Sequence, residues 1–257
     1  METIVVERAS GVVTVTLNRP ERLNALTATM WEELGSVFAD VAASSADRVL
    51  VVTGAGGAFC SGADLSSLAT LADRPVLAAM RRVGDVAVAL HRMPKPTIAR
   101  VDGVAAGAGA NLALACDLVV ASERSRFCEI FAKRGLSVDF AGSWLLPRLV
   151  GLHRAKELVL LADMLSAREA AAMGLLNRVV ADDELDTVVD DWAARLAAGP
   201  PIALSMSKLL LNTGLDVPFE QAVEAEAQAQ AVNAATADLK EALAAYAGRR
   251  APSFEGR

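Results

Sequence analysis

The stretch Gly54-Ala55-Gly56-Gly57-Ala58-Phe59-Cys60-Ser61-Gly62-Ala63-Asp64-Leu65 follows an apolar run at residues 49–52 and is rich in glycine and alanine. Small residues leave backbone N–H groups uncovered, and such groups at the end of a strand can stabilise a developing oxyanion. A second small-residue stretch, Gly103-Val104-Ala105-Ala106-Gly107-Ala108-Gly109-Ala110, follows the short apolar run at 97–101. Two such turns can converge on one carbonyl oxygen.

The first part of the chain alternates between strand and helix patterns. β-Branched runs at 4–8 and 12–17 predict a hairpin, and Thr27 or Thr29 can cap a helix that ends near residue 43. Further strands are expected at 49–53, 97–101 and 118–121, and further helices at 75–92 and 108–115. This alternation indicates parallel βαβ units and an α/β fold.

The sequence after residue 141 is predominantly helical. Ser166 and Glu169 form a predicted capping box, and Gly174 is a plausible end for the helix that they begin. The expected helices run over 141–150, 153–161, 166–173, 184–198, 201–212 and 219–248, the last with a break near residue 234.

Composition limits the classes of protein to which the chain can belong. With 257 residues, 53% of them apolar, it can bury a large core. The net charge of −6 is spread without blocks of like charge, so nucleic acid is not expected as a partner.

The N-terminus lacks the pattern of a secretory signal, which predicts a cytoplasmic location. Asn111 and Asp117 interrupt the apolar stretch 104–121, so we expect it to be buried in protein and not in a membrane.

Cysteine and histidine are too sparse to suggest metal or histidine chemistry. Cys60, Cys116 and Cys128 are odd in number and widely spaced, which predicts buried thiols and no metal site. His91 and His153 are the only histidines. The base of any reaction is therefore expected to be a carboxylate.

Seven short motifs occur in order along nearly the whole chain. They are Leu17-Asn18-Arg19-Pro20, Leu23-Asn24-Ala25-Leu26, Gly62-Ala63-Asp64, Gly103 to Gly109, Cys116-Asp117-Leu118, Leu146-Pro147-Arg148-Leu149-Val150-Gly151 and Ala172-Met173-Gly174-Leu175-Leu176. With the two turns, the strand-rich first part and the helical tail in this order, these motifs resemble the crotonase superfamily of enoyl-CoA hydratases and isomerases, and all of them are in register.

The resemblance implies a fold, a substrate class and an assembly. The fold would be a ββα spiral over residues 1–195, with a helical region at 196–257 that closes a homotrimer or a dimer of trimers. The substrate would be an acyl-CoA thioester, with no cofactor other than the coenzyme A that it carries. Its carbonyl oxygen would lie between the backbone N–H groups of Ala63 and Ala108. Losing one such donor typically costs about 3–4 kcal/mol of barrier.

Residue by residue, the resemblance also assigns contacts with the substrate. The loop with Arg22, Leu23 and Ala25 would line the CoA arm. From their apolar side chains, and not from the resemblance, Phe131 is expected to form an apolar wall of the substrate site, and Trp144 is expected to help to bury Asp139. The pantetheine and adenine end would be surrounded by Ser61, Asp64 and Leu65.

The chain departs from the hydratase pattern at the two places where a water-activating glutamate is expected. Asn111 and Phe131 occupy those places, and the nearest carboxylate in a position that the family uses is Asp139. Asp139 could instead cap the helix that begins near residue 141. Glu129 is the other nearby acid, but its offset of two residues from the glutamate position is expected to place it elsewhere.

One carboxylate is enough to move a proton between two carbons, so double-bond isomerisation with Asp139 as the base is the favoured reaction. Two alternatives stay open. One is a 2-enoyl-CoA hydratase in which Asp139, with Asn111, holds water, and the other is a CoA-thioester-binding protein without turnover. Aryl-CoA substitution ranks lower, because relatives that perform it use a histidine where this chain has Gly84.

Overall fold

The computed structural model describes residues 1–64, 66 and 75–257. Its main sheet has six strands in the order β1-β2-β3-β4-β6-β9. The first pair is antiparallel, as the expected hairpin requires, and the other neighbours are parallel. The strands are β1 (Ile4–Ala9), β2 (Val12–Leu17), β3 (Val49–Gly54), β4 (Thr97–Val101), β6 (Leu118–Ser122) and β9 (Arg178–Val180).

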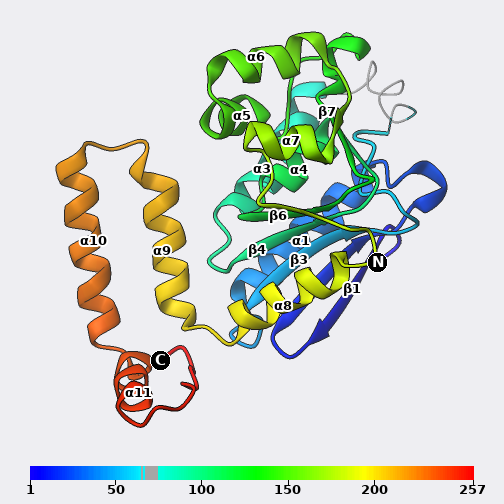
Figure 1. Ribbon diagram of the computed structural model, residues 1–257. Helices are drawn as coiled ribbons and strands as arrows, with labels where there is room; N and C mark the ends of the chain where they lie inside the picture. The colour runs from blue at the N-terminus through cyan, green and yellow to red at the C-terminus, as the bar shows by residue number, and fades with distance from the viewer. Residues whose placement is uncertain (65, 67–74) are drawn as a thin grey trace.

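Two apolar clusters cover the two faces of this sheet. Along β3, Leu50 and Val52 belong to the larger cluster, whereas Val49 and Val51 belong to the smaller one. Successive side chains of a strand point to opposite faces, so this run is buried on both sides, as in other parallel sheets. The smaller cluster is completed by α8 (Leu185–Ala197), which lies across one face of the sheet in Figure 1.

The helices α1 (Ala28–Ala43) and α3 (Val76–His91) contact each other and contribute to the larger cluster. The Thr27 side chain accepts a hydrogen bond from the Met30 backbone, as expected of the first of the two candidate caps. Pro75 precedes α3 directly, so this helix also begins where the sequence predicts.

A second, three-stranded sheet was not predicted from the sequence. It contains β5 (Val104–Ala106), β7 (Arg126–Cys128) and β8 (Leu165–Ser166) in the order β5-β7-β8. Alanine has low strand propensity, so residues 104–106 resembled part of a turn. They are extended because Ala105 pairs with β7 on one side and with Cys60 on the other.

Helical segments connect and cover this second sheet. The capping box is present: Ser166 accepts from the Glu169 backbone, and the Glu169 side chain accepts from the Ser166 backbone. The helix that they begin ends at Gly174 with a φ of 94°. These segments are α4 (Ala108–Leu114), the 3₁₀ turn η3 (Ile130–Arg134), α5 (Gly142–Val150), α6 (Leu152–Leu161) and α7 (Ala167–Met173).

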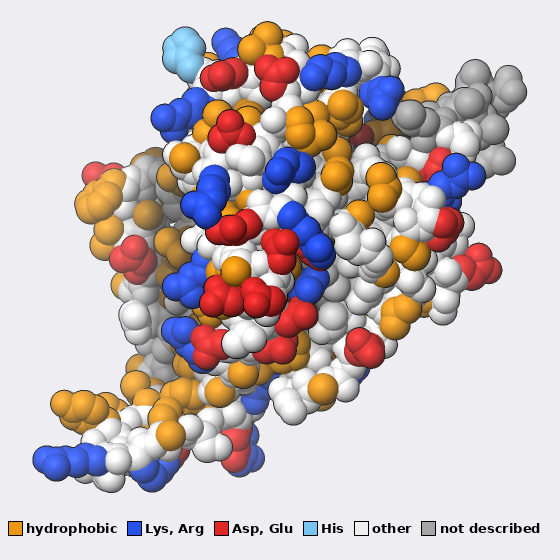
Figure 2. All heavy atoms as spheres, turned by 45° about the vertical axis from the view of Figure 1, so that its right-hand side comes forward, with side chains coloured by type: hydrophobic (Ala, Val, Ile, Leu, Met, Phe, Trp, Pro, Cys, Tyr) orange, Lys and Arg blue, Asp and Glu red, His pale blue; other side chains and the backbone are white. Residues whose placement is uncertain are grey.

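The C-terminal helices α9 (Pro201–Gly214), α10 (Phe219–Ala234) and α11 (Ala237–Ala247) extend to the side of the main body, as Figure 1 shows. Lys208 of α9 anchors them, since its ammonium lies 2.8 Å from the Asp117 carboxylate and donates to the Lys95 carbonyl. On the face shown in Figure 2, acidic and basic side chains are interspersed. Within the described ranges, no helix is both long enough and apolar enough to cross a membrane.

Candidate active site

The two small-residue turns lie side by side, as predicted. The Cys60 N–H donates to the Val104 carbonyl at 2.9 Å, and the Ala106 N–H donates to the Cys60 carbonyl at 2.8 Å. The approach beyond this pairing is close. A Cβ atom on Gly62 would lie 2.8 Å from the Ala106 oxygen and 3.7 Å from the Ala108 nitrogen. The structure thus brings the Ala63 turn next to the first residue of α4.

The residues on either side of Ala63 pair with Leu26, and this pairing directs the Ala63 N–H away from Leu26. Leu26 donates to the Gly62 carbonyl at 2.8 Å and accepts from the Asp64 N–H at 2.9 Å. Since successive N–H groups of an extended chain alternate in direction, the Ala63 N–H faces the other way. Ala108 is the first residue of α4, where an N–H has no intrahelical acceptor. Among the backbone hydrogen bonds of the described residues, none is donated by either alanine.

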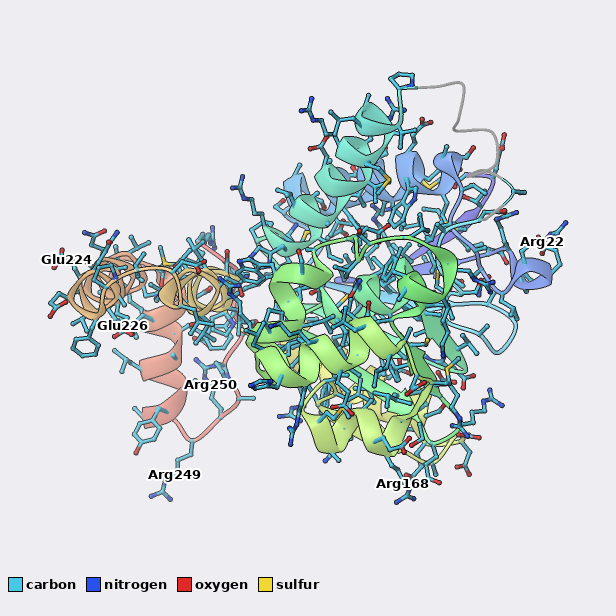
Figure 3. All side chains as sticks on the ribbon, turned by 90° about the horizontal axis from the view of Figure 1, so that it is seen from above. Arg22, Arg168, Glu224, Glu226, Arg249 and Arg250 are labelled. Carbon is cyan, nitrogen blue, oxygen red and sulfur yellow. The ribbon has the colours of Figure 1, made fainter. Side chains whose placement is uncertain are left out.

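Backbone contacts join the loop predicted to line the CoA arm to the first turn. Ser61 donates from its N–H to the Leu23 carbonyl at 2.9 Å and from its hydroxyl to the Arg22 carbonyl at 3.3 Å. Leu23 is half exposed and has a φ of 49°, and Ala25 is buried. Arg22, in the 3₁₀ turn η1 (Pro20–Arg22), projects outward at the end of the molecule opposite α10 in Figure 3. Their contact with CoA stays a prediction.

Asn24, which the sequence did not single out as functional, holds this loop in place. Its side chain is fully buried, accepts from the Arg19 N–H at 2.9 Å and donates to the carbonyls of Ala55 and Ala58 at 2.9 and 2.7 Å. One amide therefore satisfies backbone groups from both loops. The motif that carries the resemblance contains this residue, but the number of its partners could not be read from the sequence.

The Asp64 carboxylate accepts hydrogen bonds from other side chains of the protein. Its carboxylate accepts from Ser66 and from Arg19 at 2.9 Å, and these bonds, with that of Ser66 first, lower its pKa. The same guanidinium donates to the Ala25 carbonyl at 2.6 Å, so Asp64 helps to close the loop. Its binding of substrate stays a prediction, and Leu65 lies outside the described residues.

Asp139 does not cap a helix, so that alternative is wrong. The cap position of α5 belongs to Ala141 and has no side-chain hydrogen bond. The Asp139 backbone carbonyl accepts from the Gly142 N–H at 3.0 Å, whereas its side-chain Oδ1 is buried without a partner in the described structure. Burial raises the pKa of this carboxyl to about 6. An unpaired carboxylate with a pKa near the working pH is suited to act as a base.

The chain directly after Asp139 is held in an unusual conformation. Phe140 and Ala141 have φ values of 45° and 61°, which for residues with a side chain cost about 1–2 kcal/mol each. The Phe140 ring stacks on Trp31 of α1 with centroids 5.0 Å apart, which offsets part of that cost. The stack fixes the turn that carries Asp139.

Asn111 lies between the two acids of the site. Its amide nitrogen donates to the Asp139 carbonyl at 3.0 Å and to Glu129 Oε2 at 3.3 Å, while its Oδ1 is buried without a partner in the described structure. A Cβ atom on Gly142 would lie 2.4 Å from this amide nitrogen. Only glycine lets the Asn111 amide approach the backbone this closely.

Glu129 lies in the site, which corrects the expectation that it points elsewhere. It directly follows β7, is buried and accepts the hydrogen bond from Asn111. Burial, together with the charge of Asp139, raises its pKa to about 7. Phe131, two residues on, is also buried and lies behind the second turn, 3.6 Å from where a Gly107 Cβ would be. The strand ends at Cys128 and the 3₁₀ turn η3 begins at Ile130, so strand periodicity could not place Glu129 from the sequence.

Trp144 makes its aromatic contacts with other parts of the protein. The His91 ring meets it edge-on at 5.0 Å, and the Arg148 guanidinium lies 3.9 Å from its ring centroid. Arg148 also pairs with Asp216 at 2.8 Å. These contacts connect α5 to the end of α3 and to the segment after α9, and a role of Trp144 in substrate binding stays a prediction.

The three cysteines are free and buried, as the sequence predicts. Burial raises the pKa of the Cys60 thiol to about 12, so it is not a nucleophile at neutral pH. Among the described residues, no cluster of three or more histidine, cysteine, aspartate or glutamate side chains could hold a metal ion.

Comparison with known proteins identifies the family of the chain. Residues 7–257 match the family described as enoyl-CoA hydratase/isomerase. A 1,2-epoxyphenylacetyl-CoA isomerase of Escherichia coli is 36% identical, and the alignment covers 100% of both chains. A short-chain-enoyl-CoA hydratase of Clostridium acetobutylicum is 31% identical over 97% of this chain and 96% of its own. The crystal structure of an enoyl-CoA hydratase from Bacillus anthracis superposes with a TM-score of 0.96 at 32% identity, covering 100% of both chains.

The family match over residues 7–257 and the fold shared with solved enoyl-CoA hydratases define a crotonase-type enzyme. The chain belongs to the enoyl-CoA hydratase/isomerase family. Its relatives include both isomerases and hydratases, so membership alone leaves the reaction open.

Proposed function

We propose that this enzyme isomerises the double bond of an unsaturated acyl-CoA. The observation that carries the proposal is the Asp139 carboxyl, whose Oδ1 is buried and has no partner in the described part of the chain, next to the contact of Asn111 with the Asp139 carbonyl. Phe131, at a place where the hydratase pattern expects a glutamate, cannot activate water. The substrate is an acyl-CoA thioester, and coenzyme A enters only as part of it.

In the proposed reaction, the Asp139 carboxylate takes a proton from C2 of a 3-enoyl thioester. The C2–H bond breaks, and its electrons form a dienolate whose oxygen accepts hydrogen bonds from the N–H groups of Ala63 and Ala108. Asp139 then gives the proton to C4, which leaves the double bond between C2 and C3. The enzyme ends in its starting protonation state, and no other reactant is consumed.

A specific observation favours a second candidate, hydration. Glu129 adds a second buried carboxyl. The amide nitrogen of Asn111 contacts both acidic residues, and its Oδ1 is an acceptor without a partner among the described residues. A water molecule needs two to four polar partners in such a place. These groups could hold one for addition to a 2-enoyl-CoA.

The products separate the candidates. The enzyme is incubated with 3-enoyl-CoA and with trans-2-enoyl-CoA thioesters of short and medium length, and the products are analysed by liquid chromatography and mass spectrometry. We expect a shifted double bond at unchanged mass. A product heavier by one water, formed faster than any isomer, would select hydration, and tight binding with no conversion of any thioester would select a binding protein.

The raised pKa of Asp139 makes the stability of the protein depend on pH. Its folded pKa of about 6 lies above the ordinary value of 3.8, so ionisation costs stability as the pH rises through 6. Asp139→Asn is expected to raise the free energy of unfolding by about 1–3 kcal/mol at pH 8, and by less than half of that at pH 4. Urea titration at both pH values measures this difference, and a gain independent of pH would contradict a buried charge.

We also propose that the chain assembles as a homotrimer or a dimer of trimers through its C-terminal helices. Large apolar side chains are exposed on them, among them Leu209, Leu211, Leu215, Phe219 and Leu243. Light scattering coupled to size exclusion is expected to give three or six chain masses. A monomer at micromolar concentration would contradict this assembly.

A further inference from the structure

The two acids of the site are connected through a single amide. Asn111 is fully buried, and one of its N–H groups is directed to Glu129 Oε2 while the other is directed to the Asp139 carbonyl. An amide nitrogen has two hydrogens, so both are used here. A change at Glu129 therefore acts on the group that holds the Asp139 backbone in place.

The surroundings of Glu129 offer little to stabilise a charge. It lines a small cavity whose walls are mostly apolar. The titratable groups that face it are Asp139, the Cys128 thiol and Asp163, and Asp163 pairs with Lys133 at the surface. Within the described ranges, Glu129 forms no ion pair with a lysine or arginine. The apolar lining is made by Ala110, Leu114, Phe127, Leu146, Leu158, Leu165 and Leu175.

Two carboxyls that share a buried site cannot both ionise cheaply. When Asp139 carries the charge that a base requires, Glu129 is best accommodated with a proton. We propose that Glu129 is a positioning residue for Asp139: its carboxyl accepts a hydrogen bond from Asn111 and so holds this amide in place, and when ionised it suppresses the reaction by adding a negative charge beside the place where the dienolate forms. The inference rests on the proposed role of Asp139, and it adds a residue that sets the upper limit of the pH range in which Asp139 acts as a base.

The order of the two ionisations gives the expected pH dependence. With pKa values of about 6 for Asp139 and about 7 for Glu129, the pair holds one proton between these values and none above them. Below pH 6 the base is protonated, so the rate falls. Above pH 7 the dienolate would have to form beside the ionised Glu129 carboxylate, since Asp139 has by then taken up the proton and is neutral, so the rate falls again. The profile is bell-shaped.

The test is the pH profile of kcat/KM for Glu129→Gln, measured with a 3-enoyl-CoA. Glutamine keeps the acceptor for Asn111 but cannot ionise. From pH 7 to pH 8.5 the wild-type rate is expected to fall about fivefold or more and that of the variant less than about twofold. The acid limb is expected to stay in place, because it belongs to Asp139.

Further variants keep the inference testable. If Glu129→Gln does not fold, Glu129→Leu matches the apolar walls and is also expected to lack the alkaline limb. Asp163→Asn is the matched control, since it removes a carboxyl that lines the same cavity but is paired with Lys133, and its profile is expected to equal that of the wild type. An alkaline limb that persists in both Glu129 variants would overturn the inference.

The failure of this inference can be distinguished from the failure of the proposed function. If Asp139→Asn turned over substrate at the wild-type rate, Asp139 would not be the base, and the proposed function would fail whatever the pH profile of the Glu129 variants. A large loss in Asp139→Asn together with an unchanged alkaline limb in Glu129→Gln would leave the base in place and reject only the role of Glu129.

Discussion

Asp139→Asn is expected to lower kcat/KM for the isomerisation of a 3-enoyl-CoA by about 10²–10⁴-fold, the usual contribution of a placed general base. Asparagine has nearly the same shape and can keep the backbone contacts of the turn, but it cannot take a proton. The measurement is the initial rate of formation of the conjugated thioester, with the dissociation constant for a saturated acyl-CoA measured in parallel. Binding is expected to change less than about threefold, because the base acts mainly in the transition state.

Exchange of the C2 hydrogens of butyryl-CoA in D₂O provides a second measurement of the same loss. This exchange needs only a base and a stabilised enolate, so it does not depend on the natural acyl chain. A variant that exchanges these hydrogens at the wild-type rate would show that another group removes the proton, and Glu129 would be the first candidate.

Gly62→Ala is expected to lower kcat by about 10²–10³-fold, the usual effect of losing one donor of an oxyanion hole. The added Cβ would lie 2.8 Å from the Ala106 oxygen, and the backbone has a φ of 98°. Relieving this contact must move the Ala63 turn away from Ala108, so the two N–H groups could no longer meet at one oxygen. Steady-state kinetics give the loss, and thermal unfolding confirms that the variant is folded.

Gly84→Ala is the matched control for this substitution. Gly84 lies within α3, and no heavy atom of the described residues that could clash is within 4 Å of the position of an added Cβ. Alanine in a helix interior is favoured over glycine by about 1 kcal/mol, so this variant is expected to be at least as stable as the wild type and fully active. A Gly62→Ala enzyme as active as this control would contradict an oxyanion hole between the two turns.

The fold was largely predictable because its main elements carry local signals. Thr27 caps α1, and Ser166 with Glu169 begins α7, as their spacing indicates. The short strands β5 and β7 carry no such signal. They are extended because of partners distant in sequence, Cys60 for β5 and Leu165 for β7, and a single sequence does not reveal such pairings.

The parts of the candidate site that could be predicted are the residues that belong to recognisable sequence motifs. The turns of Ala63 and Ala108 converge, as their small-residue patterns indicate. The structure also places Asn111 beside the Asp139 backbone. Glu129 was misplaced because its direction depends on how the chain leaves β7 and enters η3. The stack of Trp31 on Phe140 was also missed, since it joins residues that are distant in sequence and share no pattern.

The central claim is that one carboxylate moves a proton beside a thioester whose oxygen is held by two backbone N–H groups. A crystal structure of Asp139→Asn with a 3-enoyl-CoA bound tests it most directly, because the variant should bind the substrate without converting it. We expect the thioester oxygen at about 2.7–3.1 Å from the nitrogens of both Ala63 and Ala108, with C2 and C4 facing residue 139. A thioester oxygen bound elsewhere, or an acyl chain that faces Glu129 with residue 139 turned away, would contradict the account.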